Sequence, residues 1–566
     1  MPYRRVLRLL MASALCALAA SPRLASGAVD VRVRGHESLS GAEVRDAFRA
    51  AAADSLGPGA LAAGADSIAS LLRERGHPFA RVTAGRDSVD GTGVIVEIYE
   101  GPGISLGELV VLPVSDVAAG EPARPRRLAS GGPLTREALE EYIDRLMARW
   151  ADEGRPFASV SVPRTVSLED GRVSIGLLAD PGPSVVFGEL VVSGNERTRD
   201  AVIAREAGLD NGAPYSASEL ARARPRVERL SFLDRVSEPV VAVDPASGVA
   251  TVGLEVVEGV ANSISGVLGY AGGADAEEAL TGLVDVRLGN IAGTGRVASA
   301  SWEKIRESQT VISFSYLEPW VLGAPIDLGV SGAQSVRDTF YTTTEGDLSV
   351  TARMGDRLRL TWSVGAERYV PGSELESTTT SVRTAFQAEY DATDAPLNPT
   401  GGFRLQGGVV YSAKEYAEDG ADETSGTVTA GADWYVRFRP KQVLALVGRA
   451  SAIASTEDEI PFHELLVLGG ARSLRGYREE QFRGSRTALA TVEYRLLLTR
   501  RSRVVAFVDL GYYYRPTPNF AKDSKLGYGI GLRGETRLGT IAVDYGLGEG
   551  DGFLDGKLHA GVIREF

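Results

Sequence analysis

Hydrophobic and polar positions follow different patterns in the two parts of this chain. Between about residues 29 and 259, short alternating runs that indicate strands are separated by runs with apolar residues every three or four positions. From about 260 to 566 the helical spacing disappears. Apolar and polar positions alternate within segments of about ten residues, and turns that contain Gly, Asp, Asn and Pro separate these segments. The pattern therefore predicts α/β modules followed by an all-β region.

The first region repeats one arrangement. The string GELVV occurs at 107–111 and at 188–192, and the pattern G-x-P-F-A-x-V occurs at 76–82 and at 154–160. A repeat of about 80 residues indicates an array of similar modules. Each repeat has a strand, two helical patterns and two further strands, so we predict three β-α-α-β-β modules with three-stranded sheets. Their predicted boundaries are 29–101, 102–183 and 184–259.

The second region, 260–566, has the pattern of a membrane-spanning β-barrel. Segments such as 310–320, 427–438 and 503–514 have the length of about 9–11 residues that a spanning strand needs. We count about sixteen such segments, an even number that lets the last strand run antiparallel to the first. A soluble β-sandwich is the alternative, but so many strands exceed one sandwich. We therefore predict a 16-stranded antiparallel transmembrane β-barrel.

Charge and cysteine content narrow the classes of function. The 566-residue chain carries a net charge of −13 and shows no basic stripe, which argues against a nucleic-acid partner. A basic and then apolar N-terminal stretch predicts a signal peptide at 1–28, cleaved after Ala28. The only cysteine, Cys16, would leave with it, so the mature chain forms no disulfide. An exported chain without cysteine is typical of the bacterial cell envelope.

The residue patterns of enzymes and metal sites are missing from the sequence. The four histidines lie far apart without metal-ligand spacing, and no G-x-S-x-G elbow occurs. The acidic, glycine-rich stretch 548–556 could form a calcium loop, but a turn is the simpler interpretation. We therefore expect no catalytic residues, no metal and no cofactor.

Several motifs carry a family resemblance. The stretch 193–236 resembles a POTRA domain, with G-N-x-R-T, then V-I-x-R-E, then G-x-P-Y-S. The E-P-W turn at 315–323, the D-x-x-D-x-P-x-x-P-x-G turn at 391–405 and L-R-G-Y at 474–477 resemble the outer-membrane insertase superfamily, the BamA/TamA-like proteins. Three predicted POTRA units make the layout most similar to TamA.

The resemblance predicts where the Arg- and Gly-rich loop lies. In that family the loop with R-G-Y folds back into the barrel lumen, which here implies a lumen loop at about 457–486 with Arg475, Gly476 and Tyr477 on the inner wall. Gly476 would let the backbone approach the wall closely, and Tyr477 would pack against it. From the residues alone, an exposed extracellular loop with solvated arginines would be the simpler interpretation.

Strand alternation predicts the partners of Arg475. In the segments 486–498 and 503–514, the apolar positions of one parity face lipid, so Glu493 and Asp509 face inward. A carboxylate on the lipid face would be costly near the bilayer midplane. We therefore expect these two acids to receive the planar guanidinium of Arg475.

The resemblance also implies a weak seam between the first barrel strand, around 261–270, and the last, 557–566. Glycines in both strands would limit side-chain packing there, and a terminal aromatic resembles the assembly signal of outer-membrane barrels. The residues assigned to the seam and the C-terminal strand are Gly266, Gly269, Gly561 and Phe566.

The function implied by the resemblance is that of an outer-membrane assembly factor with its POTRA modules in the periplasm. It would insert autotransporter-like barrel clients at the seam, with unfolded outer-membrane proteins, outer-membrane lipid and a TamB-like periplasmic-spanning protein as partners. A two-partner-type polypeptide secretion transporter and a component of phospholipid transport between membranes stay open as alternatives. A passive porin would not need about 230 residues of periplasmic modules.

Overall fold

The computed structural model describes residues 30–563 apart from several internal stretches. The stretches left out are 53–56, 88–92, 114–127, 163–166, 170–171, 274–275, 307–308, 338–339, 373–376, 396–397, 418–421, 463, 500–501, 517–519 and 537–538. The predicted signal peptide and Phe566 therefore lie outside the described residues. The chain forms two compact units. The first is Met1–Glu189, Asp210–Leu220 and Ala242–Thr251, and the second is Leu190–Leu209, Ala221–Val241 and Val252–Phe566.

The first module has the predicted β-α-α-β-β order. Its elements are β1 (Val31–Arg34), α2 (Gly41–Ala52), α3 (Pro58–Glu74), β2 (Arg81–Arg86) and β3 (Val94–Tyr99). Strand β3 is central, parallel to β1 and antiparallel to β2. Its alternation places Val94, Val96 and Ile98 on the buried face, where they form one core with Phe48 and Leu72 of the two helices. This burial of apolar surface stabilises the module.

The second module contains one long described helix. Its elements are β4 (Ser105–Pro113), α4 (Arg136–Asp152), β5 (Ser159–Ser161), β6 (Ser167–Glu169) and β7 (Arg172–Asp180). Helix α4 begins after Thr135, whose side chain accepts a hydrogen bond from the Ala138 amide, as an N-cap does. Tyr142, Leu146 and Trp150 recur at helical spacing and are buried. The other helix predicted for this module lies outside the described residues.

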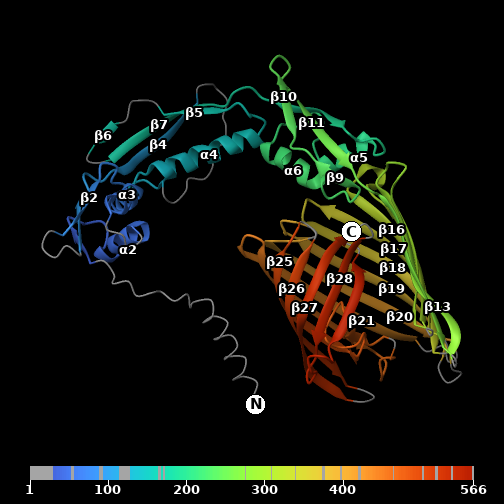
Figure 1. The fold of residues 1–566 in the computed structure, drawn as a ribbon. Coiled ribbons are helices and arrows are strands. Elements are labelled where there is room, and N and C mark those ends of the chain that lie inside the picture. The colour runs from blue at the N-terminus through green and yellow to red at the C-terminus, as the bar shows by residue number, and fades with distance from the viewer. Residues whose placement is uncertain are drawn as a thin grey trace. The chain divides into compact units, whose positions relative to one another are not determined.

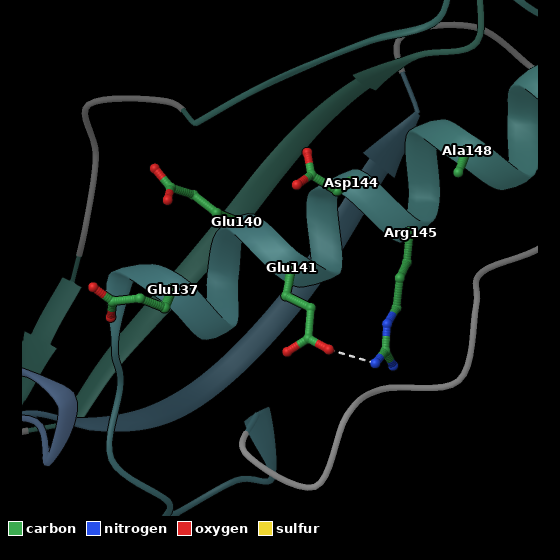
Figure 2. A pocket seen from close by; sticks show the side chains of 6 residues that line it. All are labelled: Glu137, Glu140, Glu141, Asp144, Arg145 and Ala148. Carbon is green, nitrogen blue, oxygen red and sulfur yellow. Dashed lines mark hydrogen bonds and ion pairs between the residues drawn. The ribbon is translucent and has the colours of Figure 1, made fainter. Parts of the chain in front are cut away.

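The opposite face of α4 carries a run of carboxylates. Glu137, Glu140, Glu141 and Asp144 point away from the strands, and Glu141 pairs with Arg145 (Figure 2). Glu140 pairs in the same way with Arg136 four residues away, at 2.8 Å. Exposed pairs at this spacing contribute little to the stability of a helix, because water screens them. This face of α4 therefore has the character of a solvated helix surface.

The third module has a four-stranded sheet rather than the predicted three strands. Its elements are β8 (Val186–Ser193), α5 (Asp200–Ala207), α6 (Ala217–Val227), β9 (Leu233–Val236), β10 (Val240–Asp244) and β11 (Val249–Glu258). The sheet order is β10-β11-β8, and β9 also pairs with β11. In the second module β6 likewise adds a fourth strand beside β7. The prediction was wrong for both sheets because β6 and β9 are too short for an alternating pattern to show.

An acidic side chain at the end of a strand holds the loop after the first strand in two modules. Glu258 accepts hydrogen bonds from the backbone amides of Thr198 at 2.6 Å and Arg197 at 3.1 Å. Glu100 accepts from the amides of Glu37 at 2.7 Å and Ser38 at 2.9 Å. Burial raises the pKa of each carboxyl, but these hydrogen bonds outweigh it and the net pKa is lowered. The recurring acid therefore stabilises a backbone turn.

The second region forms one continuous antiparallel sheet of sixteen strands (Figure 1). The strands, in sheet order, are β12 (Asn262–Gly273), β13 (Ala276–Ile291), β14 (Arg296–Arg306), β15 (Gln309–Glu318), β16 (Ile326–Arg337), β17 (Tyr341–Met354), β18 (Leu358–Pro371), β19 (Thr379–Asp391), β20 (Gly402–Tyr416), β21 (Asp422–Arg439), β22 (Gln442–Ser455), β25 (Arg486–Leu497), β26 (Arg503–Arg515), β27 (Ala521–Thr536), β28 (Gly539–Leu547) and β29 (Lys557–Ile563). The predicted strand number and antiparallel order are confirmed. Over the described residues, however, the terminal strands β12 and β29 are not paired with each other, so the sheet is not closed.

The two faces of this sheet differ in chemistry. On β26 the side chains of Val508 and Leu510 are each 48% exposed, whereas Asp509 between them is 0% exposed. On β25, Val492 is exposed and Glu493 is buried. One face is therefore apolar, and the other, which we call the inner face, carries buried charged groups, as in membrane barrels. Separately, none of the described helices is long and apolar enough to cross a membrane.

A long loop joins β22 to β25 and contains a short ribbon. Strands β23 (Leu466–Leu468) and β24 (Phe482–Gly484) pair antiparallel. The segment between these two strands, 469–481, contains the L-R-G-Y motif. The ribbon therefore holds both ends of this segment together, so that the motif lies at its tip.

Candidate functional site

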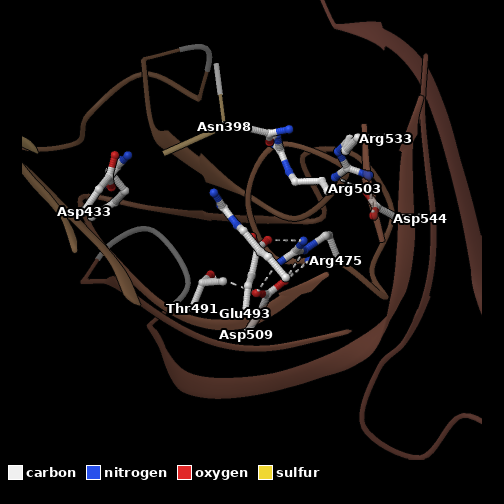
Figure 3. Close-up of polar contacts among 11 residues, drawn as sticks. Asn398, Asp433, Arg475, Thr491, Glu493, Arg503, Asp509, Arg533 and Asp544 are labelled. Carbon is white, nitrogen blue, oxygen red and sulfur yellow. Dashed lines mark hydrogen bonds and ion pairs between the residues drawn. The ribbon is translucent and has the colours of Figure 1, made fainter. Parts of the chain in front are cut away.

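The structure places Arg475 against the two acids that strand alternation assigned to it. Its Nε and Nη2 donate to the two carboxylate oxygens of Asp509, each at 2.7 Å, and its Nη1 donates to Oε1 of Glu493 at 2.7 Å (Figure 3). The Arg475 backbone amide also donates to Asp509, at 3.1 Å. Arg475 is 5% exposed, Glu493 8% and Asp509 0%. One guanidinium therefore forms ion pairs with two buried carboxylates, using the geometry that only arginine offers.

Neighbouring groups complete this cluster. Thr491 donates its hydroxyl hydrogen to Asp509 at 2.8 Å, and Arg495 donates to the second oxygen of Glu493 at 2.8 Å. The guanidinium carbon of Arg475 lies 3.6 Å from the centre of the Phe507 ring, a cation–π contact. Phe507 is directly opposite Glu493 in the β25–β26 pairing. Each carboxylate oxygen therefore has a donor, which is what makes burial of these charges tolerable.

Glycines allow the loop backbone to touch the wall. Gly476 has φ +92°, and a Cβ there would lie 2.5 Å from the carbonyl carbon of Leu547 on β28. A Cβ on Gly546 would lie 2.5 Å from the Gly476 nitrogen, and one on Gly527 of β27 would lie 2.0 Å from the Arg475 oxygen. Real side chains do not reach such distances, so the contact requires glycine on both sides. The loop tip thus meets four consecutive strands, β25 to β28.

Tyr477, the residue after Gly476, binds the loop tip to the strands through its hydroxyl and its ring. Its hydroxyl donates to the Leu526 carbonyl at 3.0 Å and accepts from the Glu549 amide at 2.9 Å. Its ring packs edge-on against Phe482, with centroids 5.1 Å apart. Leu474, which is fully buried, joins the same apolar cluster. Arg472 and Arg478, by contrast, are exposed.

A second anchor, which no sequence pattern predicted, holds the beginning of the loop. Lys414 of β20 donates to Glu457 at 2.8 Å and to Glu464 at 2.5 Å, and it is only 4% exposed. Tyr416 donates to the same Glu457 oxygen at 3.0 Å. The parity of Lys414 on its strand could have indicated an inward cation. The acids at 457–459, directly after β22, could have indicated one of its partners, Glu457.

The structure does not bring the predicted seam residues together. Gly266 and Gly269 of β12 are paired with Val284 and Thr281 of β13. Gly561 of β29 is paired with Ala542 of β28. Phe566 lies outside the described residues. The role assigned to these residues at a seam stays a prediction.

The charged groups on the inner face form ion pairs that stabilise the structure. Arg533 and Asp544 form another buried pair on β27 and β28, with both guanidinium nitrogens donating at 2.7–2.8 Å (Figure 3). Across the described part of the chain, no group of three or more His, Cys, Asp or Glu side chains is placed to hold a metal ion. What the arrangement does is fix a loop on the inner face of the sheet.

The fold combines α/β modules with a 16-stranded sheet, and a loop is fixed to the inner face of that sheet. This combination defines a class of protein, the outer-membrane barrels that carry POTRA modules. Family models agree with this class. Residues 290–557 match the Omp85 superfamily domain, and residues 185–259 match the surface antigen variable number repeat, a POTRA family. The second region is therefore an Omp85 superfamily domain that follows a POTRA module, and the chain is similar to the BamA/TamA-like proteins. The barrel accordingly lies in the outer membrane and the POTRA modules lie in the periplasm.

Curated relatives are longer than this chain. The chain is 23% identical over 452 residues to the outer membrane protein assembly factor BamA of Nitratidesulfovibrio vulgaris. The aligned residues cover 74% of this chain and 55% of that protein. It is 24% identical over 379 residues to BamA of Neisseria meningitidis serogroup B, covering 60% of this chain and 46% of that protein. The chain thus spans about half the length of the curated relatives it matches.

One solved structure shows the same fold. CdiB from Acinetobacter baumannii matches with a TM-score of 0.50 at 14% identity, covering 80% of this chain and 87% of that one. BamA from Haemophilus ducreyi lacking POTRA domains 1–3 matches with a TM-score of 0.45 at 17% identity, covering 80% and 98%. At these identities the likeness to CdiB concerns the fold alone.

Proposed function

We propose that this protein assembles β-barrel clients into the outer membrane. The observation that supports this most directly is the ionic fixation of the loop tip on the inner face through Arg475, Glu493 and Asp509. A passive pore needs an open interior, whereas here the chain's own loop occupies part of the inner face. The BamA relatives, whose name describes outer membrane protein assembly, point the same way.

The proposed mechanism uses the two terminal strands. An unfolded client would pair its strand with β12 or β29, because an edge strand presents a row of backbone donors and acceptors. Glycines at 266, 269 and 561 would limit side-chain packing where these strands meet. Folding and lipid burial of the client would supply the free energy, so no cofactor or nucleotide is required. A TamB-like periplasmic protein is the partner that we propose for the POTRA modules.

Site-specific photo-crosslinking tests this mechanism. A photoreactive residue replaces Ile264 of β12, which is 75% exposed, or Leu558 of β29, which is 68% exposed. The matched control replaces Phe314 of β15, which is 56% exposed on the apolar face of an internal strand. We expect crosslinks to a client barrel from the two terminal strands and none from Phe314.

The alternatives give other results in the same experiment. Crosslinks from Phe314 that equal those from Ile264 would contradict assembly at the terminal strands. A client that reacts with a photoreactive residue at Arg472, in the inner-face loop, and not at Ile264 or Leu558 would indicate polypeptide export. Crosslinks to phospholipid alone at the terminal strands would indicate lipid transport.

A further inference from the structure

The E-P-W turn between β15 and β16 connects the barrel to the third module. Trp320 has φ 55°, and its backbone amide donates to Asp327 of β16 at 3.2 Å. Its indole Nε1 donates to Oε1 of Glu206 at 2.6 Å. Glu206 lies near the end of α5, and both partners belong to the second compact unit. The tryptophan of this turn therefore holds a carboxylate of the POTRA module.

Arg353 at the end of β17 joins the same group. Its Nη1 donates to Glu206 at 3.0 Å, while its Nε and Nη2 donate to Asp327 at 2.9 and 3.0 Å. The side chains are 29% exposed for Arg353, 12% for Glu206 and 9% for Asp327. Partial burial weakens the screening of this ionic group by salt. We call Glu206, Trp320, Asp327 and Arg353 the docking cluster.

Further contacts hold the same helix to the next turn. Arg205, beside Glu206, donates to the Thr294 carbonyl in the β13–β14 turn at 2.9 Å. The Arg199 amide donates to the Gly293 carbonyl at 3.0 Å. A Cβ on Gly293 would lie 2.1 Å from the Arg197 oxygen, so the two backbones are in direct contact. The loop before α5 and the end of α5 therefore both contact barrel turns.

Helix α6 supplies a separate ionic contact with a third turn. Arg226 donates to both oxygens of Asp356 in the β17–β18 turn, at 2.6 and 3.2 Å. Arg229, two residues beyond the end of α6, donates to the backbone carbonyl of the same residue at 2.5 Å. The module thus contacts the turns after β13, β15 and β17 through two helices. Contacts spread over three turns resist rotation better than one contact would.

We propose that Glu206 is a positioning residue, which fixes the orientation of the third POTRA module through the docking cluster so that a client reaches the first barrel strand. Strand β11 ends at Glu258 and β12 begins at Asn262. The short connection is itself held, because the Gly289 amide donates to the Ala261 carbonyl at 3.1 Å. The module orientation therefore sets the approach to β12. This role rests on the proposed assembly function.

Distance measurements on the full chain test the docking directly. Spin labels at Val240→Cys in the module and Phe340→Cys between β16 and β17 report the orientation, since these side chains are 70% and 69% exposed. Cys16 is the only native cysteine, so Cys16→Ser gives a clean background. The variants are Glu206→Gln, which keeps size and removes the charge, and Trp320→Phe, which keeps an aromatic ring and removes the indole donor. The control is Glu255→Gln, an exposed acid on β11.

We expect Glu206→Gln to at least double the width of the distance distribution. We also expect it to lower client insertion in liposomes roughly tenfold, the usual effect of losing a hydrogen bond to a charged group. Trp320→Phe should broaden the distribution less, and Glu255→Gln should change neither measurement. Heat-modifiable gel mobility should show a folded barrel in each variant.

Two outcomes would overturn the proposal. An unchanged distance distribution in Glu206→Gln and Trp320→Phe would show that the cluster does not hold the module. A broadened distribution with normal insertion would show that orientation does not matter for assembly. Failure of the proposed assembly function can be distinguished from failure of the docking proposal. If the assembly function is wrong, the unsubstituted protein will insert no client, and the distance distributions have no bearing on that result.

Discussion

Arg475 is the residue on which the position of the lumen loop depends most. Its side chain forms ion pairs with Glu493 and Asp509 at once, and Asp509 is fully buried. Replacing a buried pair by well-packed apolar groups can be neutral, but removing one partner leaves an uncompensated charge. The two acids on β25 and β26 are therefore tolerable only while the loop is in place.

Substitution of Arg475 by alanine should destabilise the barrel by roughly 3–5 kcal/mol, the usual cost of breaking a buried ion pair. Arg475→Lys should rescue little, because lysine cannot bond both carboxylates in one plane. The measurement is the temperature at which the barrel loses its heat-modifiable gel mobility. Glu493→Gln combined with Asp509→Asn should behave similarly.

Arg472→Ala is the matched control for this prediction, since Arg472 is exposed in the same loop. It should leave the transition temperature unchanged. If Arg475→Ala and Arg472→Ala melt alike, then the ionic cluster contributes nothing to the fold.

At the residue scale, the sequence was enough to predict that Glu493 and Asp509 face inward. It was not enough to predict the other groups that surround Arg475. Strand parity was enough to turn Glu493 and Asp509 inward, because a charge facing lipid is costly. The cation–π contact of Phe507 depends on the path of the loop, which local patterns do not determine. Lys414 and its loop partners depend in the same way on contacts between residues more than 40 positions apart.

At the scale of elements, the acid that ends a module's last strand acts as a cap for a distant loop. Glu258 and Glu100 both accept two backbone amides from the turn after the first strand. The sequence carries an acid and a glycine at the ends of the strands that close the three modules, at 100–101, 180–182 and 258–259. It could not show the purpose, because the amides lie about 60 residues earlier in the chain.

Because the pKa of Glu258 is lowered on folding from its ordinary value of 4.5, its contribution is present above that value and is lost as pH falls through the folded pKa. Hydrogen exchange should therefore show protection of the Arg197 and Thr198 amides at neutral pH that decreases below pH 4.5. Glu258→Gln should reduce the neutral protection roughly tenfold and remove most of the pH dependence.

The amides of Glu37 and Ser38, held by Glu100, provide an internal control in the same sample. Their protection should not respond to Glu258→Gln. Equal loss at both sites would indicate general loosening of the modules rather than loss of one cap, and unchanged protection at Thr198 would contradict the role of Glu258.

Short elements are where the sequence pattern failed. Strands β6 and β9 have three and four residues, and an alternating signal needs more positions than that to stand out. The sixteen long strands of the second region were predictable for the opposite reason. Each has a repeated apolar and polar alternation bounded by turn residues, so even a weak signal accumulates over many segments.

At the scale of the whole molecule, the family resemblance and the predicted compartment agree with the fold. The contacts between the third module and the barrel turns could not be predicted from the sequence. The E-P-W turn was recognisable as a motif, but its link to Glu206 joins residues 114 positions apart. Such links arise from tertiary packing, which no local spacing encodes. The domain boundaries at 101, 183 and 259 and the seam residues stay predictions.

The measurement that tests the central claim most directly is client insertion by the purified protein in liposomes. A urea-unfolded model barrel is added to vesicles that contain the protein and to empty vesicles of the same lipid, and protease-protected, heat-modifiable client is followed over time. The account predicts insertion roughly tenfold faster with the protein, which corresponds to about 1.4 kcal/mol off the barrier. Equal rates in both kinds of vesicle, with the protein itself folded, would contradict the assembly function.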